Sequence, residues 1–84
     1  MPSDVLLLVE VADSSLEWDR AVKIPMYGRH GVIESWLVDV QRRTVIVFRD
    51  PEQDGYRSAL EIREGAVSPR YLTDIAIALS DLFG

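Results

Sequence analysis

Glu10 is the first residue of this 84-residue chain whose surroundings could support chemistry. It is the one charged residue in an aliphatic run from Val5 to Val11. Burying an unpaired carboxylate is costly, so the Glu10 side chain must reach solvent, a cation or a metal ion. The plainer interpretation is an ordinary carboxylate at the end of a strand, paired with Arg20 or Lys23.

Lys23 is the second such residue, because it is the only lysine in the chain. Asp19 precedes it by four residues and Tyr27 follows it by four, so a helix would place all three on one side. The plainer interpretation is a solvated lysine paired with Asp19. Residue types and spacing alone leave both interpretations of Lys23 open.

Other polar residues are weaker candidates for a site. Asp4 shares a strand face with Glu10, but six residues of strand separate the two by roughly 20 Å, too far for one metal ion. Asp13 is nearer to Glu10 and also fits a turn before a helix. His30, the only histidine, is placed beside Gly31 at an expected helix end, where a cationic side chain is favourable.

The elements that must position these residues follow from hydrophobic patterning. The run from Val5 to Val11 predicts a strand buried on both faces. Ser14 and Glu17 fit a capping box, so a helix should begin near Ser15 and continue to about His30.

Two features of this helix can be predicted further. Pro25 lies inside it and should kink it or weaken one turn. Helical periodicity divides the side chains into two groups. The side expected to pack comprises Trp18, Ala21, Val22, Pro25 and Met26, and the opposite side comprises Asp19, Arg20, Lys23 and Tyr27.

The sequence after the helix predicts mostly β-strands. Apolar runs predict a hairpin with strands at 33–40 and 43–49, a loop at 50–55 and a one-sided strand from Tyr56. Residues 74–79 suit either a strand or a helix, and 80–83 suit one final helical turn. The expected fold class is α+β, a mixed sheet with one long helix, in the order strand, helix, hairpin, strand and tail.

Composition excludes several classes of function. Nine Lys and Arg against fourteen Asp and Glu give a net charge of −5, which argues against coating nucleic acid or membranes through bulk charge. The chain has no cysteine, which excludes disulfides, thiolate zinc sites and cysteine nucleophiles. The N-terminal run is too short for a signal peptide or a membrane span, so we expect a cytoplasmic protein without membrane contact.

Several motifs in order resemble the Uma family of bacterial putative restriction endonucleases, a branch of the PD-(D/E)XK nuclease superfamily. The residues that carry the resemblance are 9–15, Asp19, Lys23, Tyr27, 31–32, 34–39, 54–56 and 81–83. The resemblance implies a restriction-endonuclease-like core acting on DNA, with Mg²⁺ or Mn²⁺ as its cofactor. It implies that Glu10 is the catalytic acidic residue and metal ligand and that Lys23 is the catalytic lysine. Asp19, Tyr27 and Asp13 would support them.

The chain also departs from the family pattern. Family members are longer, and their second catalytic aspartate lies on an earlier strand. We therefore expect residues 1–84 to form a single truncated nuclease-like domain that is weakly active or inactive alone. The alternative is a non-catalytic remnant that mediates oligomerisation or binds a partner. The strand from Val5 to Val11 would then be left at an edge, where a hydrophobic strand favours pairing, so we expect a homo-oligomer through that edge.

Overall fold

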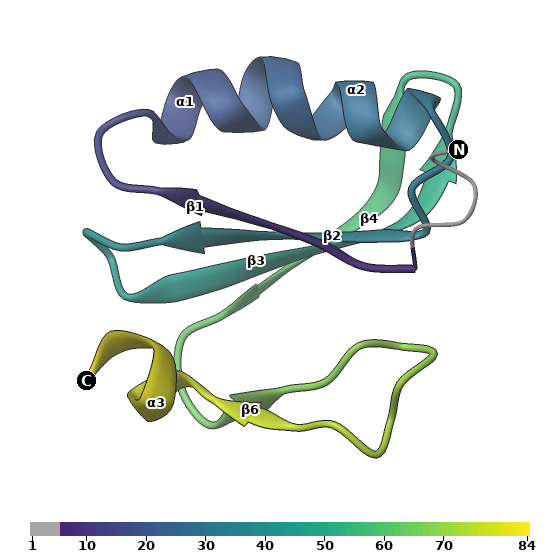
Figure 1. Ribbon diagram of the computed structural model, residues 1–84. Helices are drawn as coiled ribbons and strands as arrows, with labels where there is room; N and C mark the ends of the chain where they lie inside the picture. Colours follow the sequence, from purple (N-terminus) through teal and green to yellow (C-terminus); the bar gives the residue numbers. More distant parts are fainter. Residues whose placement is uncertain (1–5) are drawn as a thin grey trace.

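A four-stranded mixed sheet forms the centre of the fold in the computed structural model, which describes residues 6–84 (Figure 1). The strands β1 (Leu8–Ala12), β2 (Glu34–Asp39), β3 (Thr44–Glu52) and β4 (Gly55–Ile62) lie side by side in that order. β1 runs parallel to β2, and the other neighbours are antiparallel. The helix covers one face of the sheet and the tail covers the other. The predicted α+β class and the order of its elements are confirmed.

β1 is less buried than its sequence predicts. Val9 and Val11 are 47% and 62% exposed, so the expectation of a strand buried on both faces is wrong for these residues. Within residues 6–84, β1 pairs with β2 alone and therefore lies at the edge of the sheet. β2 is the strand with every residue buried. Asp4 and Val5, where this strand was expected to begin, lie outside the described residues.

The helix between β1 and β2 is continuous but changes its winding. It comprises α1 (Leu16–Trp18), the π-helical segment η2 (Asp19–Lys23) and α2 (Ile24–Arg29). At the end of η2 the Ile24 N–H donates to the Asp19 carbonyl, five residues back. Pro25, which has no N–H to donate, follows at the start of α2. The weakened turn predicted at Pro25 corresponds to this wide turn just before it.

The two ends of the helix differ in how well the sequence predicts them. The expected capping box of Ser14 and Glu17 is wrong, because the N-cap is Ser15 and no side chain caps the first turn. Ser15 Oγ instead donates to Asp19 Oδ2 at 2.8 Å. The stop at Gly31 is confirmed: Gly31 has a φ of 82°, a conformation that glycine adopts without strain.

Both hairpins form, and the second is tighter than expected. β2 and β3 pair as predicted, across a turn that ends at Arg43 with a φ of 54°. The loop predicted at 50–55 is wrong in part, because β3 continues to Glu52 and pairs there with Gly55. Only residues 53–54 remain between the strands. The cross-strand ladder overrides the local loop preference of Pro51 and its polar neighbours.

The tail packs under the sheet as a small layer. It comprises β5 (Ala66–Val67), β6 (Ile77–Ala78) and α3 (Leu79–Phe83), with β5 and β6 paired. Val67 and Leu79 join Trp36 in the core on this face. The ambiguous segment 74–79 thus ends as a short strand that leads into a helical turn. Across the described residues, no helix is long and apolar enough to cross a membrane.

Candidate functional site

Glu10 lies on the face of β1 that the helix covers. Its Cα pairs in register with that of Leu37, and paired residues of parallel strands direct their side chains to the same face. Leu37 is fully buried in the core beneath the helix, together with Ile24. The Glu10 carboxylate therefore points toward the helix, and its side chain remains 21% exposed because β1 is at the edge.

Three helical side chains meet this carboxylate or each other. Lys23 Nζ donates to Glu10 Oε1 at 2.8 Å, although the two residues are 13 apart in the chain. Tyr27 OH donates to Glu10 Oε2 at 3.1 Å. Asp19 Oδ1 lies 3.4 Å from Lys23 Nζ, on its other side. The structure therefore brings together four of the five residues predicted for the site.

Asp13, the fifth predicted residue, is directed elsewhere. Its Oδ1 accepts a long hydrogen bond of 3.4 Å from Gln41 Nε2 in the turn between β2 and β3. Ala12, beside it, is tied to the same turn, because its carbonyl accepts from the Val40 N–H at 3.0 Å. Asp13 thus contributes to the connection between β1 and the first hairpin.

The helix turns Asp19, Lys23 and Tyr27 toward the sheet, which reverses the predicted orientation, while Arg20 of the same predicted side is exposed. Asp19 is buried, while Trp18, Val22 and Met26 of the expected packing side are exposed. The expectation was wrong because it placed Trp18, Val22 and Met26 against the sheet, whereas Ile24 is the buried apolar residue of the helix. Here the sheet presents a carboxylate at that place, and Lys23 supplies its counter-ion.

Two glycines fix how closely the helix approaches the sheet. A Cβ atom on Gly28 would overlap the Gly55 carbonyl of β4, so this position cannot take alanine without a shift of the backbone. After the helix, Gly31 N–H donates to the Gly28 carbonyl and Val32 N–H to the Tyr27 carbonyl, which completes a Schellman motif.

The charges of the site determine which atoms carry protons. The hydrogen bond to Glu10, and then the contact with the Asp19 carboxylate, raises the pKa of Lys23 above its ordinary 10.5. Burial, followed by the hydrogen bond to Glu10, raises the pKa of Tyr27 above 10.0. At neutral pH Lys23 is therefore an ammonium group and Tyr27 a neutral phenol. Both are hydrogen-bond donors, and Lys23 has no lone pair with which to accept a proton.

The carboxylate oxygens of Glu10 and Asp19 fit part of a site for a divalent metal ion. Glu10 and Asp19 supply the oxygen ligands that Mg²⁺ prefers, and Mg²⁺ usually binds one or two carboxylates together with phosphate and water. Asp19 Oδ1 is buried and accepts no hydrogen bond, although Lys23 lies within ion-pair distance. In the part of the chain from residue 6 onward, no three His, Cys, Asp or Glu side chains gather to hold a metal ion.

A second carboxylate centre, which the sequence analysis did not identify, lies on the opposite face of the sheet. Glu34 is 1% exposed, and its Oε2 accepts from Trp36 Nε1 at 2.6 Å. Arg49 Nε lies 3.3 Å from the same oxygen, and Arg70 N–H donates to Oε1 at 2.8 Å. The signal in the sequence was Glu34 itself, a charged residue that interrupts the apolar run from Val32 to Val40.

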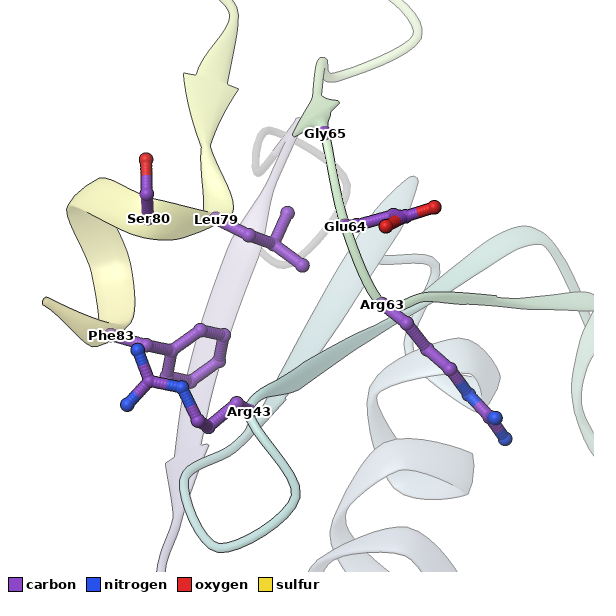
Figure 2. Close-up of a pocket in the computed structure, with 7 residues that line it drawn as sticks. All are labelled: Arg43, Arg63, Glu64, Gly65, Leu79, Ser80 and Phe83. Carbon is purple, nitrogen blue, oxygen red and sulfur yellow. The ribbon is translucent and has the colours of Figure 1, made fainter.

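Three hollows in the described part of the surface are lined by residues other than Glu10. One of about 350 Å³ lies beside the tail, where the Arg43 guanidinium stands 5.5 Å from the Phe83 ring centre (Figure 2). Arg63 at its rim is already paired with Glu61 at 2.8 Å. Among residues 6–84, the Glu10 side chain lies on the edge strand and is partly accessible to solvent.

Comparison with known proteins agrees with this architecture. The Uma2 family, described as "Putative restriction endonuclease", matches residues 1–80. A crystal structure of a putative nuclease belonging to DUF820, from Anabaena variabilis ATCC 29413, superposes with a TM-score of 0.69 at 21% identity. The match covers 94% of this chain and 45% of that one, so this chain spans less than half of the nuclease's length. No curated protein matches the chain.

Proposed function

Because this chain belongs to the Uma2 family of putative restriction endonucleases, we propose that it contributes part of the active site of a metal-dependent DNA endonuclease. The observation that carries the proposal is the contact of Lys23 Nζ with Glu10 Oε1 at 2.8 Å, made between a strand and the following helix. It joins the two residues that the family resemblance assigns to catalysis. The proposal includes a cytoplasmic location, where such an enzyme would meet DNA.

In this proposal each residue has a defined task. Glu10 is the metal ligand and binds Mg²⁺ or Mn²⁺ through a carboxylate oxygen. The bound ion would polarise a phosphate and lower the pKa of a water molecule that attacks it. Lys23, held protonated, donates hydrogen bonds to a phosphate oxygen and stabilises its developing negative charge. Asp19 and Tyr27 keep Lys23 and Glu10 in place from either side.

The proposed active site needs a further acidic ligand. Glu10 and Asp19 are the carboxylates that contact Lys23, and residues 6–84 bring no third ligand to them. We therefore propose that residues 1–84 form one nuclease-like domain, with weak or no nuclease activity until another acidic group reaches Glu10. Another copy of the chain, associated through the edge of β1, is one source of that group.

The alternative is a non-catalytic module that binds a partner or a second copy. The observation that favours it is the exposed β1 edge, where Val9 and Val11 are accessible to another chain. The two functions differ in one property. The endonuclease requires that Glu10 bind a divalent ion, whereas the binding module does not.

The test is a titration with Mg²⁺ or Mn²⁺ followed by residue-resolved NMR, combined with a DNA cleavage assay. Glu10→Gln removes the charge of the proposed ligand with little change of shape. Glu61→Gln is the matched control, because Glu61 is also a strand carboxylate paired with a cationic side chain, Arg63. We expect shifts at Glu10, Asp19 and Lys23 in the wild type and the control and not in Glu10→Gln. An unlocalised response at millimolar metal would contradict the endonuclease proposal.

A further inference from the structure

The buried carboxylate of Asp19 has one oxygen that no donor satisfies. Asp19 is 1% exposed, and its Oδ2 accepts a hydrogen bond from Ser15 Oγ at 2.8 Å. Its Oδ1 is also buried and accepts no hydrogen bond among the described residues. Burying a charged oxygen without a hydrogen bond is costly, so a donor that reached Oδ1 would stabilise the protein.

Lys23 Nζ lies between this oxygen and Glu10. It donates to Glu10 Oε1 at 2.8 Å, whereas Asp19 Oδ1 is 3.4 Å away, beyond the usual length of about 2.7–2.9 Å for a bond between an ammonium group and a carboxylate. A shift of Nζ by about 0.6 Å, the difference between the two distances, would bring it to bonding distance of Oδ1. Lys23 can therefore exchange one carboxylate for the other with little movement.

The two oxygens of Glu10 have donors of different charge. Oε2 accepts from the neutral phenol of Tyr27 at 3.1 Å, and Oε1 accepts from the ammonium group of Lys23. A divalent cation at this carboxylate would repel Lys23 and not Tyr27, because like charges a few ångströms apart repel strongly. Lys23 thus occupies the place of a cation at Oε1, and an ion that binds there must displace it.

We infer that Asp19 receives Lys23 when a divalent cation binds Glu10, so that Lys23 Nζ moves its hydrogen bond from Glu10 Oε1 to Asp19 Oδ1. The inference rests on the proposed function, because it takes Glu10 to be the metal ligand. It assigns Asp19 as a positioning residue that acts on the ion through Lys23 and not as a ligand. Lys23 then stays beside the ion, where it can donate to a phosphate oxygen.

The local backbone supports this role for the pair. Asp19 and Lys23 are the first and last residues of the π-helical segment η2, and such wide turns are rare and frequent at functional sites. The bond from Ser15 fixes Oδ2 of Asp19 and leaves Oδ1 on the side of Lys23. Asp19 is therefore a fixed acceptor, whereas the long side chain of Lys23 is partly exposed among the described residues and can change its rotamer.

Mg²⁺ affinities of four proteins, measured by NMR titration of the Glu10 signals at one pH and ionic strength, test the inference. They are the wild type, Lys23→Met, Asp19→Asn and the double variant. Lys23→Met removes the competing cation and should bind Mg²⁺ about tenfold more tightly. Asp19→Asn removes the charge that receives Lys23 and should bind about threefold to tenfold more weakly.

The double variant separates a positioning residue from a ligand. When Lys23 is absent, Asp19→Asn should change the affinity no more than Glu17→Gln does. Glu17→Gln is the matched control, because it removes the same charge from an exposed position of the same helix. A further loss of affinity on Asp19→Asn in the absence of Lys23 would mean that Asp19 binds the ion directly, and it would overturn the inference.

Side-chain NMR signals give an independent readout. In the wild type, Mg²⁺ should shift both the side-chain nitrogen signal of Lys23 and the carboxyl carbon signal of Asp19. In Lys23→Met the Asp19 signal should no longer respond, although Glu10 still does. An Asp19 response that persists without Lys23 contradicts the inference. This comparison needs only Lys23→Met, so it still decides if Asp19→Asn does not fold.

The same titrations distinguish failure of the inference from failure of the proposed function. If Glu10 responds to Mg²⁺ but Lys23→Met binds no more tightly than the wild type, the inference fails and the proposed function stands. If Glu10 responds neither in the wild type nor in Lys23→Met, the proposed function fails and the inference fails with it.

Discussion

The sheet carries two carboxylate centres, Glu10 under the helix and Glu34 above the tail, and they differ in how completely their oxygens are used. Glu34 is enclosed and accepts from an indole N–H and a backbone N–H beside a guanidinium group. Glu10 accepts from Lys23 and Tyr27 and remains open to solvent at the sheet edge. A ligand can reach Glu10 and cannot reach Glu34.

This difference shows why a charged residue in an apolar strand does not by itself identify a site. Burying Glu34 is costly, so the fold must keep each of its partners in place. Glu10 keeps part of its hydration and can exchange it for another ligand. Both centres carry a charge, so it is the solvent accessibility of the carboxylate that distinguishes the candidate functional centre, Glu10, from the structural centre, Glu34.

The largest expected effect is a loss of stability when the buried Glu34 carboxylate loses its cationic partner, Arg49. Arg49→Met leaves Glu34 buried without its cationic partner and should lower the free energy of unfolding by about 3–5 kcal/mol. Arg57→Met, which removes an exposed partner of Glu52, should cost at most about 1 kcal/mol. Urea unfolding monitored by circular dichroism measures both. Equal effects would mean that the Glu34 centre is not structural.

Adding Glu34→Gln to Arg49→Met sharpens this test. Glutamine can still accept a hydrogen bond from Trp36 or from the Arg70 N–H, and it carries no charge that needs a counter-ion. The double variant should therefore recover part of the loss, as expected for residues that share one interaction. A purely additive loss would contradict the pairing of Glu34 with Arg49.

The second-largest effect is expected for Gly28→Ala, which should change the surroundings of Glu10 and leave those of Glu34 unchanged. Gly28→Ala introduces a methyl group against the Gly55 carbonyl and should destabilise the fold by about 1–3 kcal/mol. The helix must move, so the NMR signals of Lys23 should shift while the indole N–H signal of Trp36 stays in place. Arg29→Ala, at an exposed neighbouring position, is the control. A shifted Trp36 signal would show that the two centres are not independent.

A smaller effect is expected when Glu10 loses its charge. Glu10→Gln should bring the pKa of Lys23 down toward 10.5, because it removes the largest cause of the raised value. Since the chain has one lysine, the ¹³C NMR titration of its side chain has a single signal to follow. The contribution of the raised pKa to stability is present below pH 10.5 and is lost as the pH rises through the folded-state value. An unchanged titration would contradict the hydrogen bond.

The smallest effect concerns the outer layer of the Glu34 centre. Arg70 also donates to Asp50 Oδ1 at 2.6 Å, and this bond lowers the pKa of Asp50 below 3.8. Its contribution is therefore present above pH 3.8 and disappears as the pH falls through the folded-state value. Asp50→Asn should remove only this acid-dependent part, measured by urea unfolding between about pH 5 and 2. A large loss at neutral pH would mean that Asp50 is part of the Glu34 centre itself.

The contrast between the two centres also separates what could be predicted from what could not. Glu10 and Lys23 were recognisable because their types are rare in their surroundings, and both are found together. Glu34 was not recognisable as a buried centre, since no local pattern shows that Arg49 and Arg70 will meet it. Its partners come from β3 and the tail, at separations of 15 and 36 residues.

The sequence by itself determined the order of the elements, the end of the helix at Gly31 and the residue types able to do chemistry. These features follow from local periodicity and backbone preferences. Only the tertiary structure decided that the charged row of the helix faces the sheet, that β1 is exposed at an edge and that Glu34 is enclosed. The physical reason is that burial depends on which segments pack together. The hydrophobic periodicity of one strand or helix does not specify which other segments will pack against it.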